Sequence, residues 1–310
     1  MITITGRTAW MARMPRLTGR LTFSIGLAMA SVVSLSSGPT RAAEVEALSA
    51  RIVDLTYDVY LGGLHIFSFD VDMTLQPDSY RVAAEGRTRG MVGWLYEWDV
   101  KLAAEGLDHN GRIEPRRYVA ETEWQHRQRT VHLGFAEGGR YDLQRNPPPE
   151  PDPDIEGGLP ETLPEGIVDP LSFAVAASRA VEESGRCDQT VPVFDGQRRF
   201  DLSVKEVEET TLPPNGYSIY QGPAVRCSLS MERISGFRKS WRSSRQWDAG
   251  SSAPPTIWVA SIRQDLPPVP VRYEGAIALG NMVIHLTAAE VRTEPAGAVP
   301  DERLRQQGAR

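Results

Sequence analysis

The sequence is poor in the residues that build reactive and metal-binding motifs. Only two of its 310 residues are cysteines. They do not form a Cys-x-x-Cys pair, so neither redox catalysis nor a thiolate zinc cluster is supported. Five histidines are present, without HxxxH or HExxH spacing. There is no GxSxG nucleophile elbow, no GxGxxG before a predicted helix and no GxxxxGKS/T phosphate loop. The sequence therefore predicts no metal, no cofactor and no catalytic residues, and a non-catalytic role is favoured over an enzymatic one.

Lysine is also rare, and the basic residues are unevenly distributed. The first 42 residues contain five arginines and no acidic residue, and fifteen uncharged, mostly apolar residues follow Arg20. This run is shorter than the roughly 18–20 residues that a membrane-spanning helix needs. Small residues near position 42 provide a cleavage site. We interpret residues 1–42 as a cleaved signal peptide, with an uncleaved anchor as the alternative, and expect a periplasmic or secreted product without a lipid-bearing cysteine.

The rest of the chain is acidic. Without the five arginines of residues 1–42, 29 of the 34 basic residues remain against 40 acidic residues, a formal charge of −11. This charge disfavours binding to nucleic acids and to anionic membrane surfaces. No stable membrane insertion is expected, and the oligomeric state is not indicated. A hydrophobic small molecule or an envelope protein is the expected partner.

The two cysteines, Cys187 and Cys227, lie in the part predicted to reach an oxidising compartment. An even number of cysteines in such a compartment favours a disulfide. Closing a loop of this length would stabilise the fold by roughly 4 kcal/mol in the chain-entropy model. Two separate buried thiols are the alternative.

From about residue 50 onward, apolar and polar side chains alternate with a period of two. The clearest example is the pair of runs 53–61 and 67–75, which flank Gly62-Gly63, a sequence suited to a tight type I′ turn. Further alternating runs follow at 80–84, 92–104, 118–124, 131–135, 200–204, 225–231, 258–262 and 271–286. The pattern predicts a mainly β protein of about a dozen antiparallel strands in a strongly curved or partly closed, barrel-like sheet.

One α-helix is predicted among the strands, at about residues 170–184. Asp169 suits its N-cap, Pro170 its first position and Gly185 its end. Its apolar stripe consists mainly of small residues, which suits close packing against a sheet: Leu171, Ala174, Val175, Ser178 and Val181. We expect this helix and the strands to form a single domain over residues 43–294.

Two segments are expected to lie outside the packed part of the domain. Residues 146–166 contain seven prolines, three glycines and six acidic residues. Such a segment is predicted to be an exposed, partly disordered loop that buries no core, and it lacks the DxDxDG spacing of a calcium site. Residues 295–310 are expected to be a disordered tail.

The candidate ligand-binding residues are aromatic. Trp94, Tyr96 and Trp98 would share one face of the predicted strand 92–104, and Trp124 has similar parity further along the chain. On the concave side of a curved sheet, such side chains can line a pocket for an apolar or carbohydrate-like ligand. The same residues can instead form the core under the helix, and this interpretation is favoured.

Five segments carry a resemblance to known proteins: YDVYLGGLHI at 57–66, DPLSF at 169–173, VFDGQRRFDL at 193–202, YQGPAVRCSL at 220–229 and LPPVPVRYEGAIALGNMVIHL at 266–286. In their order and spacing they resemble the exported bacterial proteins grouped as domain-of-unknown-function family 3108. The resemblance covers most of the mature chain. It implies a secreted or periplasmic, mostly antiparallel β domain with no assigned role, and it transfers no catalytic residues.

Two functions from different classes are compatible with these observations. The favoured one is a non-catalytic, envelope-associated protein that holds a hydrophobic ligand or a protein partner. The alternative is a periplasmic hydrolase whose residues converge only in the folded structure. A pocket in which a histidine lies within hydrogen-bonding distance of an acid and a serine would favour the hydrolase.

Overall fold

The computed structural model describes most of the chain that follows the predicted signal peptide. It covers residues 49–150, 152–239, 254–264, 266–277 and 279–295, all within one compact unit, Thr40–Arg310. The predicted signal peptide at 1–42 and the predicted tail beyond residue 295 lie outside the described residues. Within the described ranges, no helix has the length and hydropathy needed to cross a bilayer.

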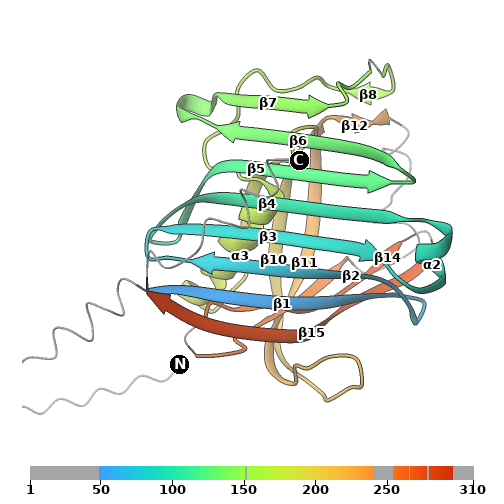
Figure 1. Cartoon of the computed structure of the whole chain (residues 1–310). Helices are drawn as coiled ribbons and strands as arrows, with labels where there is room; N and C mark the ends of the chain where they lie inside the picture. The colour runs from blue at the N-terminus through green and yellow to red at the C-terminus, as the bar shows by residue number, and fades with distance from the viewer. Residues whose placement is uncertain (1–48, 151, 240–253, 265, 278, 296–310) are drawn as a thin grey trace, which may run out of the picture. The chain divides into compact units, whose positions relative to one another are not determined.

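Strands dominate the structure, and thirteen of them form one antiparallel sheet (Figure 1). Their order is β7-β6-β5-β4-β3-β2-β1-β15-β14-β13-β11-β10-β9. The bounds are β1 Ser49–Leu61, β2 Leu64–Leu75, β3 Ser79–Thr88, β4 Trp98–His109, β5 Arg112–Trp124, β6 Arg127–Phe135, β7 Tyr141–Asn146, β9 Gln189–Phe194, β10 Arg199–Leu212, β11 Gly222–Ser235, β13 Thr256–Ala260, β14 Val269–Ile277 and β15 Gly280–Pro295. A separate pair consists of β8 (Ile155–Glu156) and β12 (Phe237–Arg238).

The helical elements named within the described residues are α2 (Gly90–Leu95), the 3-10 turn η1 (Glu137–Gly139) and α3 (Pro170–Ser184). The prediction of a mainly β fold of about a dozen antiparallel strands is therefore confirmed, and so is the prediction of a helix at residues 170–184.

The first hairpin forms as its sequence predicts. Leu61 pairs with Leu64, and the two turn glycines, Gly62 and Gly63, have φ values of 57° and 85°. These left-handed values are the ones that a type I′ turn requires. On β1, the apolar side chains of the alternation are buried: Val53, Leu55, Tyr57 and Val59.

Strand β1 also joins the two ends of the described chain. On its other side it pairs with β15, from Ser49 opposite Pro295 to Leu61 opposite Met282. This pairing is distant in sequence, and it makes the first seven strands and the last strands one continuous sheet. The sequence pattern predicts strands but not such partners, because any two alternating runs can pair.

The sheet curves so that its two halves lie on either side of α3 (Figure 1). One buried cluster combines Tyr80 and Val82 of β3, Val175 of α3 and Phe200 of β10. Strands β3 and β10 are far apart in the strand order, so only a strongly curved sheet can bring their side chains into one cluster. The sheet ends at β7 on one side and β9 on the other, and it curves without closing.

A buried polar network holds the N-terminal end of α3. The Oδ1 atom of Asp169 accepts hydrogen bonds from the backbone N–H groups of Leu171 and Ser172, both at 2.9 Å. The Ser172 hydroxyl donates to Asp169 Oδ2 and lies 2.6 Å from the hydroxyl of Tyr80 on β3. Asp169 is fully buried, and its burial raises its pKa to about 6, although these hydrogen bonds act in the opposite direction.

A buried ion pair holds α3 further along its length. Arg179 Nε donates to Asp108 Oδ2 on β4 at 2.8 Å, and both side chains are largely buried. The other carboxylate oxygen of Asp108 accepts a hydrogen bond from the backbone of Gly111 at 2.8 Å. The helix is thereby tied to the turn between β4 and β5.

The proline-rich segment 146–166 differs from its prediction. Leu163 is only 5% exposed and belongs to a core cluster with Leu133 of β6 and Phe194 of β9. Its backbone N–H donates to Gly139 O at 2.8 Å. The expectation that this segment buries no core is wrong, because its average composition hides an apolar residue that packs against β6 and β9.

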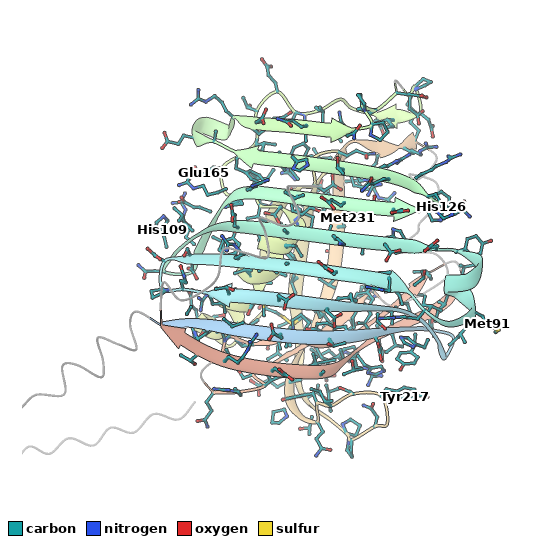
Figure 2. The ribbon with its side chains drawn as sticks, viewed as in Figure 1. Met91, His109, His126, Glu165, Tyr217 and Met231 are labelled. Carbon is teal, nitrogen blue, oxygen red and sulfur yellow. A yellow bond between two sulfur atoms is a disulfide. The ribbon has the colours of Figure 1, made fainter. Side chains whose placement is uncertain are left out.

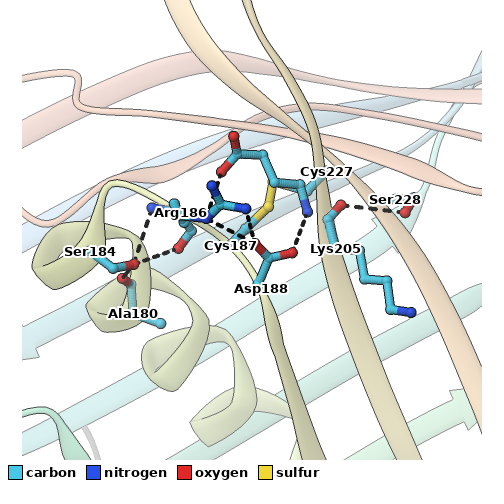
Figure 3. Close-up of polar contacts among 9 residues, drawn as sticks. Ala180, Ser184, Arg186, Cys187, Asp188, Lys205, Cys227 and Ser228 are labelled. Atoms are coloured by element: carbon cyan, nitrogen blue, oxygen red, sulfur yellow. Dashed lines mark hydrogen bonds and ion pairs between the residues drawn. A yellow bond between two sulfur atoms is a disulfide. The ribbon is translucent and has the colours of Figure 1, made fainter. Parts of the chain in front are cut away.

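Cys187 and Cys227 form a disulfide, as predicted (Figure 3). Cys187 follows the C-terminal end of α3, Cys227 lies in β11, and both are buried. The neighbouring Asp188 pairs with Arg186 at 2.6 Å and accepts a hydrogen bond from the backbone N–H of Glu206 at 3.0 Å. The disulfide therefore fixes the exit of α3 to the second half of the sheet.

Candidate ligand-binding cavity

An apolar cavity of about 360 Å³ lies between α3 and the concave face of the sheet. Its lining comes from β1 to β4, from α3, and from β13 to β15 with the segment that precedes β14. Glu85 and Arg272 are the only charged residues among the described residues that line it. The volume lies within the range of about 300–1,000 Å³ that is usual for small-molecule sites.

Small side chains on facing elements create this space. Ala174 and Ser178 of α3 line the cavity, and so do Ala84 and Gly86 of β3. These side chains are too short to meet across the gap, and Ala174 is exposed although it lies on the predicted core-facing stripe of the helix. The expected close packing of this stripe is therefore wrong at Ala174, because small residues on both sides leave a gap instead of a tight contact.

A row of aromatic rings runs along one wall of the cavity. Tyr57 stacks on Phe69 with ring centroids 4.8 Å apart, and Phe69 lies 6.5 Å from Phe67. Phe67 in turn lies 5.2 Å from Trp98, which is partly exposed. The row therefore leads from the buried Tyr57 to the surface at the start of β4.

Gly86 makes room for this aromatic row. A Cβ atom at Gly86 would lie 2.6 Å from the Phe67 ring and 2.8 Å from Phe69 Cβ. Neither distance is compatible with normal packing, so a larger residue would displace the rings. Glycine at this position of β3 is required by the close approach of Phe67 and Phe69.

Two hydroxyl groups of the cavity wall already have hydrogen-bond partners in the protein. The Tyr57 hydroxyl donates to Pro270 O at 2.9 Å, and the Ser178 hydroxyl donates to Pro268 O. Arg272 pairs with Glu274, and its guanidinium lies 5.3 Å from the centroid of the Trp258 ring. Burial raises the pKa of Tyr273 to about 12, so this phenol stays neutral near pH 7. The wall consequently suits an apolar ligand better than a charged one.

Three of the four predicted aromatic residues, Tyr96, Trp98 and Trp124, do not line this cavity. Trp94 lies in α2, and Tyr96 follows that helix. Trp98 begins β4 and stands opposite Trp124 at the end of β5. The side chains of Tyr96, Trp98 and Trp124 are 55%, 42% and 51% exposed, so the interpretation of these three as core is wrong. Trp98 is nevertheless connected to the cavity through its contact with Phe67.

The predicted strand 92–104 begins later than expected, at Trp98. Residues 90–95 form α2 instead, and this correction removes Trp94 from the predicted strand face. Gly90 has a φ of 60°, and the Gly93 N–H donates to Arg89 O at 3.0 Å. Two glycines in this connection favour a compact turn, and the apolar alternation across it is coincidental.

Sequence reasoning missed the residues that line the cavity. Tyr57, Phe67 and Phe69 were predicted only as the apolar face of two strands. Alternation identifies the inward face of a strand, but it does not distinguish a packed wall from an open one. The signal available in the sequence was the small size of these residues on two elements that face each other: Ala84 and Gly86 on β3, and Ala174 and Ser178 on the helix.

One cluster combines a histidine, a serine and an acid on β1 and β2. His65 Nε2 lies 3.0 Å from Ser68 Oγ and 3.2 Å from Asp58 Oδ1, and Ser68 donates to Asp58 at 2.7 Å. In a hydrolytic triad the serine and the acid contact different imidazole nitrogens, whereas here both contact Nε2. Ser68 is also buried and does not line the apolar cavity. This geometry does not support the alternative hydrolase function.

His285 of β15 is a buried histidine. It is buried under Tyr217, whose ring stacks on it at a centroid distance of 5.6 Å. Burial, followed by the charge of Arg272, lowers its pKa below the usual value, so the imidazole stays neutral near pH 7. Within the described part of the chain, no group of three or more His, Cys, Asp or Glu residues is arranged to hold a metal ion.

Comparisons with known proteins do not assign a function. A solved structure with similarity to this chain is titled as a beta-barrel-like protein of the domain of unknown function DUF1849, from Brucella abortus. It is 12% identical, with a TM-score of 0.42, and the match covers 78% of this chain and 98% of that chain. A search of curated proteins finds no match. Residues 56–287 match the family model described as "Protein of unknown function (DUF3108)", and the chain belongs to this family.

Proposed function

We propose that this protein is a non-catalytic binding protein of the cell envelope, which holds a hydrophobic molecule with an extended alkyl chain in the cavity beside α3. The observation that carries the proposal is the cavity itself, about 360 Å³ in volume and lined almost entirely by apolar side chains. The hydroxyls of Tyr57 and Ser178 are hydrogen-bonded within the protein, and Tyr273 is neutral. An apolar chain can enter beside these groups without leaving either hydroxyl unpaired.

An exported location supports this function. The disulfide suits an oxidising compartment, and the N-terminal 42 residues have the composition of a signal peptide. Hydrophobic molecules that cross an aqueous compartment need a protein that removes their alkyl chains from water. An apolar cavity in a folded, disulfide-linked domain would provide this.

The test is a binding series with fatty acids of increasing length, measured by displacement of a fluorescent apolar probe. The protein is expressed as the full chain, exported, purified and freed of lipid. Each additional methylene group that enters the cavity contributes about 0.8 kcal/mol, so the affinity should rise about fourfold per carbon until the cavity is full. A series without any dependence on chain length would contradict the proposal.

A matched pair of helix variants locates the binding. Ala174→Phe places a large ring in the cavity and should weaken binding of the longest chains by about tenfold or more. Ala180→Phe makes the same change on α3 at a position that does not line the cavity, and it should leave the affinity unchanged. Circular dichroism of both variants checks that the fold is retained. Equal affinities for the two variants would place the ligand elsewhere.

A further inference from the structure

Exposed apolar side chains gather at one end of the sheet. Six of them lie at the turns β1–β2, β3–β4, β5–β6 and β14–β15, and we call them the apolar rim: Leu64, Met91, Tyr96, Trp98, Trp124 and Leu279. They are between 42% and 81% exposed. The strand register brings these turns to the same end, since Leu61 pairs with both Leu64 and Met282, and Trp98 pairs with Trp124. Figure 2 shows Met91 and His126 at this end.

The opposite end of the sheet has a different surface. It carries the turns β2–β3, β4–β5 and β6–β7, and Figure 2 shows His109 and Glu165 there. None of the described residues in these three turns is a large, exposed apolar residue. The three turns at the opposite end therefore lack the exposed apolar residues that form the rim.

The apolar rim is continuous with the cavity. Trp98 of the rim contacts Phe67, and Phe67, Gly86 and Val100 line the part of the cavity nearest this end. Toward the other end, Leu75 and Tyr80 belong to a closed core cluster with α3 instead. A ligand that enters the cavity from the rim would meet apolar side chains along its whole path.

The charge of the two ends also differs. The rim segments 62–66, 87–99, 122–129 and 276–282 contain four arginines and three acidic residues. The segments 74–80, 107–114 and 134–142 at the opposite end contain two arginines and five acidic residues. The acidic excess of the chain is thus absent from the rim, where Arg87, Arg89, Arg127 and Arg129 are exposed. A bilayer with anionic headgroups would meet a slightly basic, aromatic surface.

We propose that the apolar rim docks onto the surface of a lipid bilayer and that the hydrophobic ligand passes between the bilayer and the cavity through it. This inference rests on the proposed function, since the rim serves the cavity as its entrance. Tryptophan and tyrosine side chains favour the bilayer interface, because they combine an apolar ring with a polar group. Arginines beside them add attraction to anionic headgroups. The contact is peripheral, with no strand or helix inserted across the bilayer.

The test is flotation of the purified exported protein with vesicles of phosphatidylethanolamine and phosphatidylglycerol. The intact protein should float with the vesicles, and brominated lipids should quench part of its tryptophan fluorescence. Replacing both rim tryptophans, Trp98→Ser with Trp124→Ser, should weaken the association about tenfold. The matched control is Val207→Ser with Ile234→Ser, which removes two apolar side chains of similar exposure from β10 and β11. The control should bind vesicles as the intact protein does.

Three results would overturn docking. The first is the absence of flotation by the intact protein, and the second is equal flotation of the rim variant and its control. A rim that instead mediates dimerisation, detected by sedimentation in the absence of lipid together with a lack of vesicle binding, would also overturn it. Failure of docking and failure of ligand binding give different results. The rim variant should still bind soluble fatty acid, whereas Ala174→Phe should lose fatty acid binding and still float with the vesicles.

Discussion

Two hollows of similar volume differ in almost every other respect. The apolar cavity beside α3 measures about 360 Å³, and a second hollow of about 390 Å³ lies around the β4–β5 and β6–β7 turns. The second is lined by six charged residues: Arg112, Glu114, Arg116, Glu137, Arg140 and Glu165. Several of these form exposed ion pairs, such as Arg112 with Glu165 at 3.3 Å. Volume alone therefore does not identify a ligand site, since charged side chains that pair with one another line the second hollow.

The apolar cavity also contrasts with the packed cluster that α3 forms with β3, β9 and β10. Val175 of α3 packs there with Tyr80, Val193 and Phe200. One residue earlier, the small side chain of Ala174 lines the open cavity. The helix stays in place over the gap because polar contacts and a disulfide hold it at other points along its length. The variants below test this difference, from the largest expected change in the free energy of unfolding to the smallest.

Removal of the disulfide should have the largest effect. Cys187 and Cys227 close a loop with a sequence separation of 40 residues, and the chain-entropy model predicts a loss of about 4 kcal/mol in the free energy of unfolding for Cys187→Ala with Cys227→Ala. Because the bridge fixes the exit of α3, ligand affinity should fall as well. Urea denaturation of the variant and of the intact protein measures the loss. A change below about 1 kcal/mol would contradict this role.

Breaking the ion pair beneath the helix should rank second. Asp108→Ala leaves Arg179 without its buried carboxylate, and we expect a loss of about 3 kcal/mol in the free energy of unfolding, because the remaining contact with Glu182 compensates only in part. Glu182→Gln is the matched control, since Glu182 contacts the same arginine from a more exposed position. It should cost less than about 1 kcal/mol. Equal losses in the two variants would show that burial of the pair is unimportant.

The pH dependence of stability should report on Asp169. The pKa of Asp169 is about 6 in the folded protein, above the usual aspartate value of 3.8, so the folded state binds the proton more tightly. The free energy of unfolding should therefore decrease as the pH rises from about 4 to about 6, by up to about 3 kcal/mol. Asp169→Asn keeps a helix cap without the charge and should remove this decrease. Denaturation of both proteins between pH 4 and pH 7 measures it, and parallel pH profiles would contradict the assignment.

Filling the cavity should have the smallest effect on stability and the opposite sign. Ala84→Val places two additional carbons between Val71 and Leu102, its partners on β2 and β4. The variant should be more stable by about 1 kcal/mol and should bind long alkyl chains less tightly. Thermal unfolding and the fatty acid series measure the two effects. A stabilised variant with undiminished ligand affinity would show that the ligand does not occupy this space.

The sequence predicted the elements of the fold well and its open spaces poorly. Asp169, Pro170 and Gly185 specify the limits of α3 locally, because capping needs only neighbouring residues. The glycines after Leu61 specify the first hairpin in the same local way. Trp94 was misplaced because a run of apolar residues across two glycines has the spacing of a strand without being one. The cavity depends on which small residues face each other across the molecule, and no local pattern contains this information.

The strand-forming runs and the capped helix follow from the sequence alone, because alternation and capping involve only neighbouring residues. The disulfide partners follow as well, because the chain has only two cysteines. Only the tertiary structure decided that β1 pairs with β15, that α3 lies across a gap and that exposed tryptophans meet at one end of the sheet. The physical reason is that these features arise from the register and curvature of a sheet whose partners are far apart in the chain.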